Sequence, residues 1–360
     1  IPRLTKGPVT VELEAKWAAN LGTRHSVFVN SGSSAILLLL AALKAGGRLR
    51  NGKIVVPAVS WLTDVSSPMQ LGMEPILCDC NLEDLSCDLG HLERIFEEQR
   101  PAAMILVSVL GLVPDMAAVL RLCAEYDVLL MEDVCESMGS EYDGKFLGTF
   151  GAASVFSMYH GHHLSTIEGG FVCTDDKELN DLLLSLRSHG WDRDLDAETQ
   201  NAWRAKFETD AFSALYQFYH PGFNLRSTDL QAYIGLTQLD KLEEIRQRRN
   251  RNFEIYRENI NCSELQLIER GFISNFAFPV VSRERREIVM RLSEDDVEVR
   301  PLIAGNMARK AFWLKAFGPV ELPYADLIED HGFYLPNHQY LKEEDVLRIC
   351  EIVNAKSLDV

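Results

Sequence analysis

The feature that most constrains the fold is a regular alternation of short apolar runs with longer helix-like segments. Seven runs are rich in β-branched and aromatic residues, are bounded by turn residues and are separated by segments with helical spacing of apolar side chains. Buried strands that are joined through helices form a largely parallel sheet covered on both faces. We therefore predict an α/β fold. Its strands are expected at residues 26–29, 53–57, 74–79, 103–109, 128–131, 153–157 and 170–174.

The composition changes near Leu236, which suggests a second domain. A charged, helix-like segment covers residues 238–259, and strand-like pieces follow at 275–281 and 298–302. No internal repeat or Pro/Gly-rich linker interrupts the chain. We expect a large domain over 1–235 and a smaller C-terminal α+β domain over 236–360.

Charge and hydropathy exclude several classes of partner. The 36 Lys and Arg residues against 53 Asp and Glu give a net charge of -17, which repels nucleic acids. No apolar run approaches the roughly 20 residues that span a membrane. No signal peptide is visible, and the eight scattered cysteines suit reduced thiols, so we expect a cytoplasmic protein.

Two motifs at predicted strand ends suggest a ligand crevice. Residues 30–34, Asn-Ser-Gly-Ser-Ser, open a helix whose free N–H groups favour an anion such as phosphate, although a serine-rich helix cap explains them equally well. Asp133 closes an apolar strand and faces the same crevice. Its carboxylate could hold a protonated pyridine nitrogen, or it could simply cap a following helix.

The segment 156–170, Phe-Ser-Met-Tyr-His-Gly-His-His-Leu-Ser-Thr-Ile-Glu-Gly-Gly, is more specific. Its spacing resembles the DegT/DnrJ/EryC1/StrS sugar aminotransferases. The resemblance implies the aspartate aminotransferase (type I) fold, a pyridoxal or pyridoxamine phosphate cofactor and a homodimer with shared active sites. The implied cofactor contacts are Ser31, Gly32, Ser33 and Ser157 at the phosphate, Trp61 over the ring, Asp133 at its nitrogen, Glu136 near its hydroxyl and Asn224 at the neighbouring subunit's cofactor.

The chain departs from the family at residue 162, where His replaces the usual lysine. Imidazole cannot form the stable imine by which lysine holds the cofactor aldehyde, but it carries protons well near neutral pH. The patterns at 132–139, 188–191, 300–306 and 337–339 resemble the family's dehydratases, which remove the 3-hydroxyl of GDP-4-keto-6-deoxymannose for lipopolysaccharide O-antigen deoxysugars. His160 stands where those enzymes usually have an aromatic residue.

This branch of the family implies a 3-dehydratase in which His162 is the catalytic acid and base and L-glutamate regenerates the pyridoxamine form. His189 would be a second polar group near the sugar. Arg193 and Arg226 are candidates for a substrate phosphate or carboxylate, with structural salt bridges as the equal alternative. The nucleotide and the stereochemistry of the hexose stay open.

Other interpretations compete with this one. The chain could be a non-catalytic or regulatory protein that has lost the lysine, or an aminotransferase with a single Lys to His substitution. His160, His162 and His163 could bind zinc, and Cys78, Cys80 and Cys87 could suggest an iron–sulfur cluster. Their spacing does not match the usual metal sites, so we expect no metal.

Overall fold

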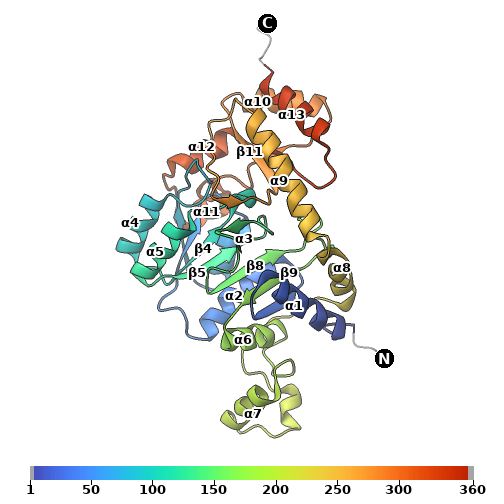
Figure 1. Ribbon diagram of the computed structural model, residues 1–360. Coiled ribbons are helices and arrows are strands. Elements are labelled where there is room, and N and C mark those ends of the chain that lie inside the picture. Colours follow the sequence, from blue (N-terminus) through green and yellow to red (C-terminus); the bar gives the residue numbers. More distant parts are fainter. Residues whose placement is uncertain (1–3, 356–360) are drawn as a thin grey trace.

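The computed structural model describes residues 4–355, with a seven-stranded sheet at its centre (Figure 1). The strand order is β1-β9-β8-β5-β4-β2-β3. Neighbouring strands are parallel, except that β9 is antiparallel to both β1 and β8. The predicted seven-stranded, mostly parallel sheet is confirmed. The strands are His25–Val29 (β1), Lys53–Pro57 (β2), Glu74–Cys78 (β3), Ala103–Val107 (β4), Leu129–Asp133 (β5), Ala153–Ser157 (β8) and Gly170–Thr174 (β9).

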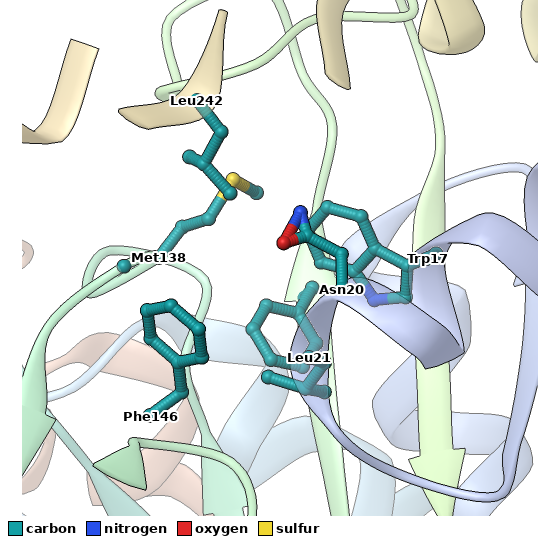
Figure 2. A pocket seen from close by; sticks show the side chains of 8 residues that line it. Trp17, Asn20, Leu21, Met138, Phe146 and Leu242 are labelled. Carbon is teal, nitrogen blue, oxygen red and sulfur yellow. The ribbon is translucent and has the colours of Figure 1, made fainter. Parts of the chain in front are cut away.

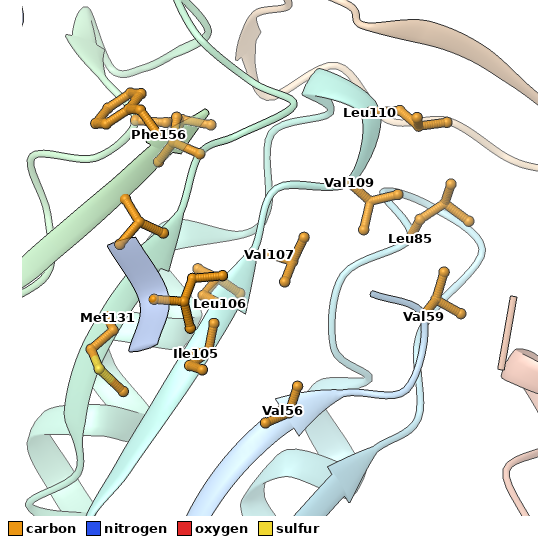
Figure 3. Packing of buried hydrophobic residues seen from close by; sticks show 14 of the residues in the cluster. Val56, Val59, Leu85, Ile105, Leu106, Val107, Val109, Leu110, Met131 and Phe156 are labelled. Atoms are coloured by element: carbon orange, nitrogen blue, oxygen red, sulfur yellow. The ribbon is translucent and has the colours of Figure 1, made fainter. Parts of the chain in front are cut away.

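Helices cover this sheet and complete its core. The helix α2 is buried over most of its surface, because it packs against β8 and β9 and lies between α3 and α6. The interior near the carboxyl ends of β2 and β4 is filled with aliphatic side chains such as Val56 and Val107 (Figure 3). The helices of this part are Pro8–Leu21 (α1), Gly32–Ala45 (α2), Leu62–Gln70 (α3), Leu89–Gln99 (α4), Met116–Tyr126 (α5), Lys177–Arg187 (α6), Ala197–Lys206 (α7) and Asp229–Leu239 (α8).

The C-terminal part contains a small antiparallel sheet in the order β11-β13-β12. A hairpin of β6 and β7 forms a further sheet with β10. The division into domains at residue 235 stays a prediction. The remaining strands and α-helices are Glu141–Tyr142 (β6), Lys145–Phe146 (β7), Leu242–Asn259 (α9), Gly271–Phe272 (β10), Ala277–Val281 (β11), Arg285–Glu294 (α10), Arg300–Pro301 (β12), Ala311–Phe317 (α11), Pro323–His331 (α12), Gly332–Pro336 (β13) and Glu343–Asn354 (α13).

Two expectations for the C-terminal part need correction. The charged helix predicted from residue 238 begins at Leu242, because α8 runs on to Leu239 and the chain turns at Asp240 and Lys241. The strand predicted from residue 275 begins at Ala277. Asn275 is instead fully buried, and its side-chain amide donates to the carbonyl of Leu110 at 2.7 Å. No described helix is both long and apolar enough to cross a membrane.

Candidate active site

The serine–glycine loop forms a close cradle with the ends of β8 and β9. Ser31 caps α2, and its hydroxyl accepts a hydrogen bond from the backbone N–H of Ser34 at 3.0 Å. A Cβ atom on Gly32 would lie only 2.8 Å from the Cβ of Ser157. A Cβ on Gly170 would lie 2.6 Å from the carbonyl oxygen of Ser31. The loop is therefore both a helix cap and a cradle that suits a phosphate, with hydroxyl and N–H donors at the positive end of α2.

Asp133 ends β5 and is 5% exposed. Its Oδ1 accepts a hydrogen bond from the backbone N–H of Cys135 at 2.8 Å. Because the described chain turns here and starts no helix, the alternative of a helix-capping Asp133 is wrong. The preceding Glu132 is buried and accepts three backbone hydrogen bonds, from Gly148, Phe150 and Gly151. Glu132 thus has a structural role, whereas the Asp133 carboxylate suits a cationic ring nitrogen.

Glu136 and His162 have strongly perturbed acidity. Burial raises the pKa of Glu136 to about 7, and the neighbouring Asp133 adds to this although the Leu110 N–H opposes it. Burial lowers the pKa of His162 to about 4, and the carbonyl of Cys135 opposes this only in part. His162 is therefore neutral near pH 7. Its Nδ1 has no hydrogen-bond partner among residues 4–355, and its ring lies 5.2 Å from that of Phe276.

Sequence reasoning missed two buried residues near these groups. Asp64, in the first turn of α3, is fully buried and interacts electrostatically with Asp133 and Glu136. Asp64 follows the predicted ring-stacking residue Trp61 by three positions, but no motif marked it. We call Asp64, Asp133, Glu136 and His162 the floor of the site.

The second missed residue, Arg249, lies on α9 and is 2% exposed. Its guanidinium donates to the backbone carbonyls of Asn275, Phe276 and Asn337, and burial lowers its pKa to about 10. The Asn337 side chain donates in return to the Arg249 carbonyl at 2.9 Å. The 337–339 motif therefore supports the segment behind His162. Arg249 was hidden in an arginine-rich helix, and only its burial distinguishes it.

His189 lies in a second cluster, at the end of α6. It adopts a positive φ of 63°, and its ring lies 5.2 Å from that of Trp191. The guanidinium groups of Arg193 and Arg226 lie 4.0 and 5.5 Å from the Trp191 ring centroid. Arg226 also donates to the side-chain carbonyl of the exposed Asn224 at 3.1 Å. We call His189, Trp191, Arg193, Asn224 and Arg226 the rim.

The rim connects to the cradle through the backbone. Val29 at the end of β1 pairs with Arg226, and the N–H of Asn30 donates to the carbonyl of Leu225 at 3.0 Å. Ser33, the second residue of α2, is exposed, and Trp61, at the start of α3, is 56% exposed. The roles predicted for these residues, and for every other site residue, stay predictions.

In the described part of the chain, the histidines and cysteines that suggested metal sites do not form a cluster of ligands. His163 Nε2 lies 2.9 Å from the carbonyl of Ser274 and is buried there, and its ring, like that of His162, lies near Phe276. All eight cysteines are free thiols. Within residues 4–355, no three His, Cys, Asp or Glu side chains are placed to hold one metal ion.

A small pocket elsewhere is apolar and contains no predicted site residue. Figure 2 shows Trp17 and Leu21 of α1 facing Met138 and Phe146 across it. It offers no charged group for a phosphate or a sugar. We take the cradle and the floor as the candidate active site because they place a loop suited to phosphate near buried groups of perturbed acidity.

The sheet, the phosphate cradle and the carboxylate at the end of β5 together define a pyridoxal-phosphate protein of the aspartate aminotransferase fold. The chain belongs to the DegT/DnrJ/EryC1/StrS aminotransferase family, whose model matches residues 2–354. The fold, the family and the class of cofactor predicted from the sequence are thereby confirmed.

The relatives and solved structures include dehydratases. The GDP-4-keto-6-deoxy-D-mannose 3-dehydratase of Yersinia pseudotuberculosis is 34% identical over 97% of this chain and 91% of its own length. A crystal structure of a GDP-4-keto-6-deoxymannose-3-dehydratase mutant with bound GDP-perosamine has a TM-score of 0.89 at 29% identity, covering 98% of this chain and 94% of that one. Another, with a trapped adduct of glutamate and pyridoxal phosphate, has a TM-score of 0.88 with the same identity and coverage.

Proposed function

We propose that this chain is a pyridoxamine-phosphate-dependent 3-dehydratase of a nucleotide-linked 4-keto-6-deoxyhexose, with GDP-4-keto-6-deoxymannose as the substrate. The observation that carries the proposal is His162. The family's lysine position holds a half-buried, neutral imidazole whose Nδ1 has no hydrogen-bond partner among residues 4–355. This imidazole interacts with the backbone of Cys135, two residues after the carboxylate that suits the ring nitrogen. Such a group can move protons but cannot hold the cofactor covalently.

The chain's own residues divide the work of the reaction. Ser31, Gly32 and Ser157 would hold the cofactor phosphate, and Asp133 would keep the ring nitrogen protonated. The bound cofactor supplies an amine for the keto group and a ring that accepts electrons. His162 takes a proton from the C4′ carbon and delivers a proton to the departing C3 oxygen of the sugar. A lowered pKa makes protonated His162 a stronger acid than ordinary imidazolium, which favours delivery to a poor leaving group.

The proposed substrate and amino donor follow from the relatives. GDP and the hexose are proposed from the similar dehydratases, and L-glutamate from the structure that contains its adduct. L-glutamate would return the cofactor to its amine form, and ammonia would leave with each turnover. A cytoplasmic location stays a prediction.

Mass spectrometry of the product tests the function directly. With GDP-4-keto-6-deoxymannose and glutamate, the sugar should lose about 16 mass units, because hydrogen replaces a hydroxyl. Parallel reactions with CDP- and dTDP-linked keto sugars test the nucleotide. If no sugar changes mass while the cofactor binds, the chain is a binding or regulatory protein. An amino sugar as the product would identify an aminotransferase instead.

Borohydride reduction tests the role assigned to residue 162. No lysine lies between Ser157 and Gly170, so reduction of the pyridoxal phosphate form should fix no cofactor on the protein. Peptide mass mapping checks this result. A labelled lysine peptide would contradict the proposal.

A further inference from the structure

A second buried carboxyl lies beside Asp133, and the proposed mechanism does not use it. Asp64 has no exposed surface. Neither of its carboxyl oxygens has a hydrogen-bond partner among residues 4–355. A buried carboxylate without a donor is strongly destabilised. This side chain therefore needs a proton or a ligand.

The charged residues that face Asp64 are acids. Burial is the largest cause that raises the pKa of Asp64 well above its ordinary range, followed by Asp133 and then Glu136, while the Trp61 backbone opposes the shift. The Cys135 thiol lies beside the same pair, and burial raises its pKa too, so it stays neutral. Two ionised carboxylates have no donor for each other, whereas one proton between them makes a hydrogen bond.

The surroundings of Asp133 decide which carboxyl keeps the proton. Asp133 already accepts a hydrogen bond from the Cys135 N–H at 2.8 Å, whereas the charged form of Asp64 is favoured only by the Trp61 backbone, which does not offset its burial. Burial raises the pKa of Asp133, but the Cys135 donors and Asp64 both lower it. Hydrogen bonds to a charged carboxylate stabilise that form. The negative charge accordingly resides on Asp133 and the proton on Asp64.

We propose that Asp64 is a positioning residue of the cofactor site, which keeps its proton and donates a hydrogen bond to Asp133. The inference rests on the proposed function insofar as Asp133 binds the ring nitrogen. The pair would then present one negative charge to that nitrogen. A carboxylate that accepts another hydrogen bond is less basic. Asp133 would therefore leave the proton on the ring, which keeps the ring an electron acceptor.

Infrared difference spectroscopy of the full, cofactor-free chain tests the protonation. With isotope-labelled aspartate, the wild type at neutral pH should show a protonated carboxyl band that Asp64→Asn removes. The control is Asp229→Asn, because Asp229 is also buried but accepts hydrogen bonds from Gly7 and Thr10, which lower its pKa. This control should keep the band. A wild type without the band, or a band that survives Asp64→Asn, would overturn the proposal.

The second measurement follows the ring nitrogen of an isotope-labelled cofactor by NMR. Asp64→Asn retains an N–H donor of similar size, so the nitrogen should stay protonated as in the wild type. Asp64→Leu removes the donor and makes Asp133 more basic, so the proton equilibrium between the nitrogen and Asp133 should move toward Asp133 by about tenfold, and the nitrogen signal at neutral pH should move toward its unprotonated position. An unchanged nitrogen signal in Asp64→Leu would overturn the proposal. A chain that shows both signals but converts no sugar would support this inference and refute the proposed function.

Discussion

The floor and the rim of the site differ in how they hold their polar groups. The floor combines two buried acids, Asp64 and Asp133, with the half-buried Glu136 and His162, and burial shifts the acidity of all four toward the neutral form. The rim places the guanidinium groups of Arg193 and Arg226 near the ring of Trp191, and Trp191 and Arg193 lie on the segment that leads into the projecting helix α7 (Figure 1). Burial tunes proton transfer, whereas accessible cations recruit an anionic substrate. Changes in the floor should therefore affect chemistry, and changes in the rim should affect binding.

The largest effect is expected for His162→Asn. This substitution keeps a polar side chain of similar size but removes proton transfer, so the dehydration rate constant should fall by about 10² to 10⁴. Cofactor binding should persist, because the cradle and Asp133 are unchanged. Single-turnover kinetics and cofactor titration check both parts.

The neighbouring His163→Asn is the matched control for that experiment. His163 is buried against the Ser274 carbonyl, so its loss should lower stability while the folded protein keeps its rate constant. Dehydration at the wild-type rate in His162→Asn would refute the role of His162. Activity lost to a chelator and restored by zinc would favour the metal alternative.

The contrast between floor and rim also explains what the sequence could predict. Apolar periodicity predicted all seven strands of the main sheet, and the resemblance brought Ser31, Gly32 and Ser157 to one place. Periodicity could not find Asp64 or Arg249, because their importance comes from burial by segments distant in the sequence. The helix boundary at Leu242 was missed for a related reason, since a charged run continues across the turn.

The next largest effect concerns how the free energy of unfolding depends on pH through Glu136. Burial raises the pKa of Glu136 to about 7, so the folded chain binds more protons than the unfolded chain above the ordinary glutamate pKa. The contribution of Glu136 to the free energy of unfolding should therefore fall as pH rises through this window, by about 3 kcal/mol, and level off above it. His162, with a lowered pKa, changes stability in the opposite direction as pH rises.

Urea unfolding of wild type and Glu136→Gln isolates this contribution. The glutamine keeps an acceptor for the Leu110 N–H, and the His162 contribution cancels in the comparison. The variant should gain stability relative to wild type between about pH 5 and about pH 8. A constant difference across that range would show that Glu136 does not titrate there.

A smaller effect is expected at the rim. Arg226→Gln removes the charge near Trp191, so KM for the nucleotide sugar should rise about tenfold with little change in kcat. The rise should shrink at high salt, since salt screens an accessible charge. Arg283→Gln is the control, because Arg283 is exposed and paired with Glu264 on the C-terminal part. A fall in kcat with an unchanged KM would place Arg226 in the chemistry.

The smallest expected signal tests whether two subunits share each site. The exposed Asn224 is predicted to reach the cofactor of the partner, whereas His162 serves its own subunit. If so, a mixed dimer of Asn224→Ala and His162→Asn chains contains one site with both residues intact and one with neither. Random mixing makes about half of the dimers mixed, so about a quarter of the wild-type activity should return from two nearly inactive parents. Mixtures as inactive as their parents, with mixed dimers demonstrated by mass spectrometry, would show that each site is built from one chain. In that case, the rim residues of each chain would serve only the active site of that same chain.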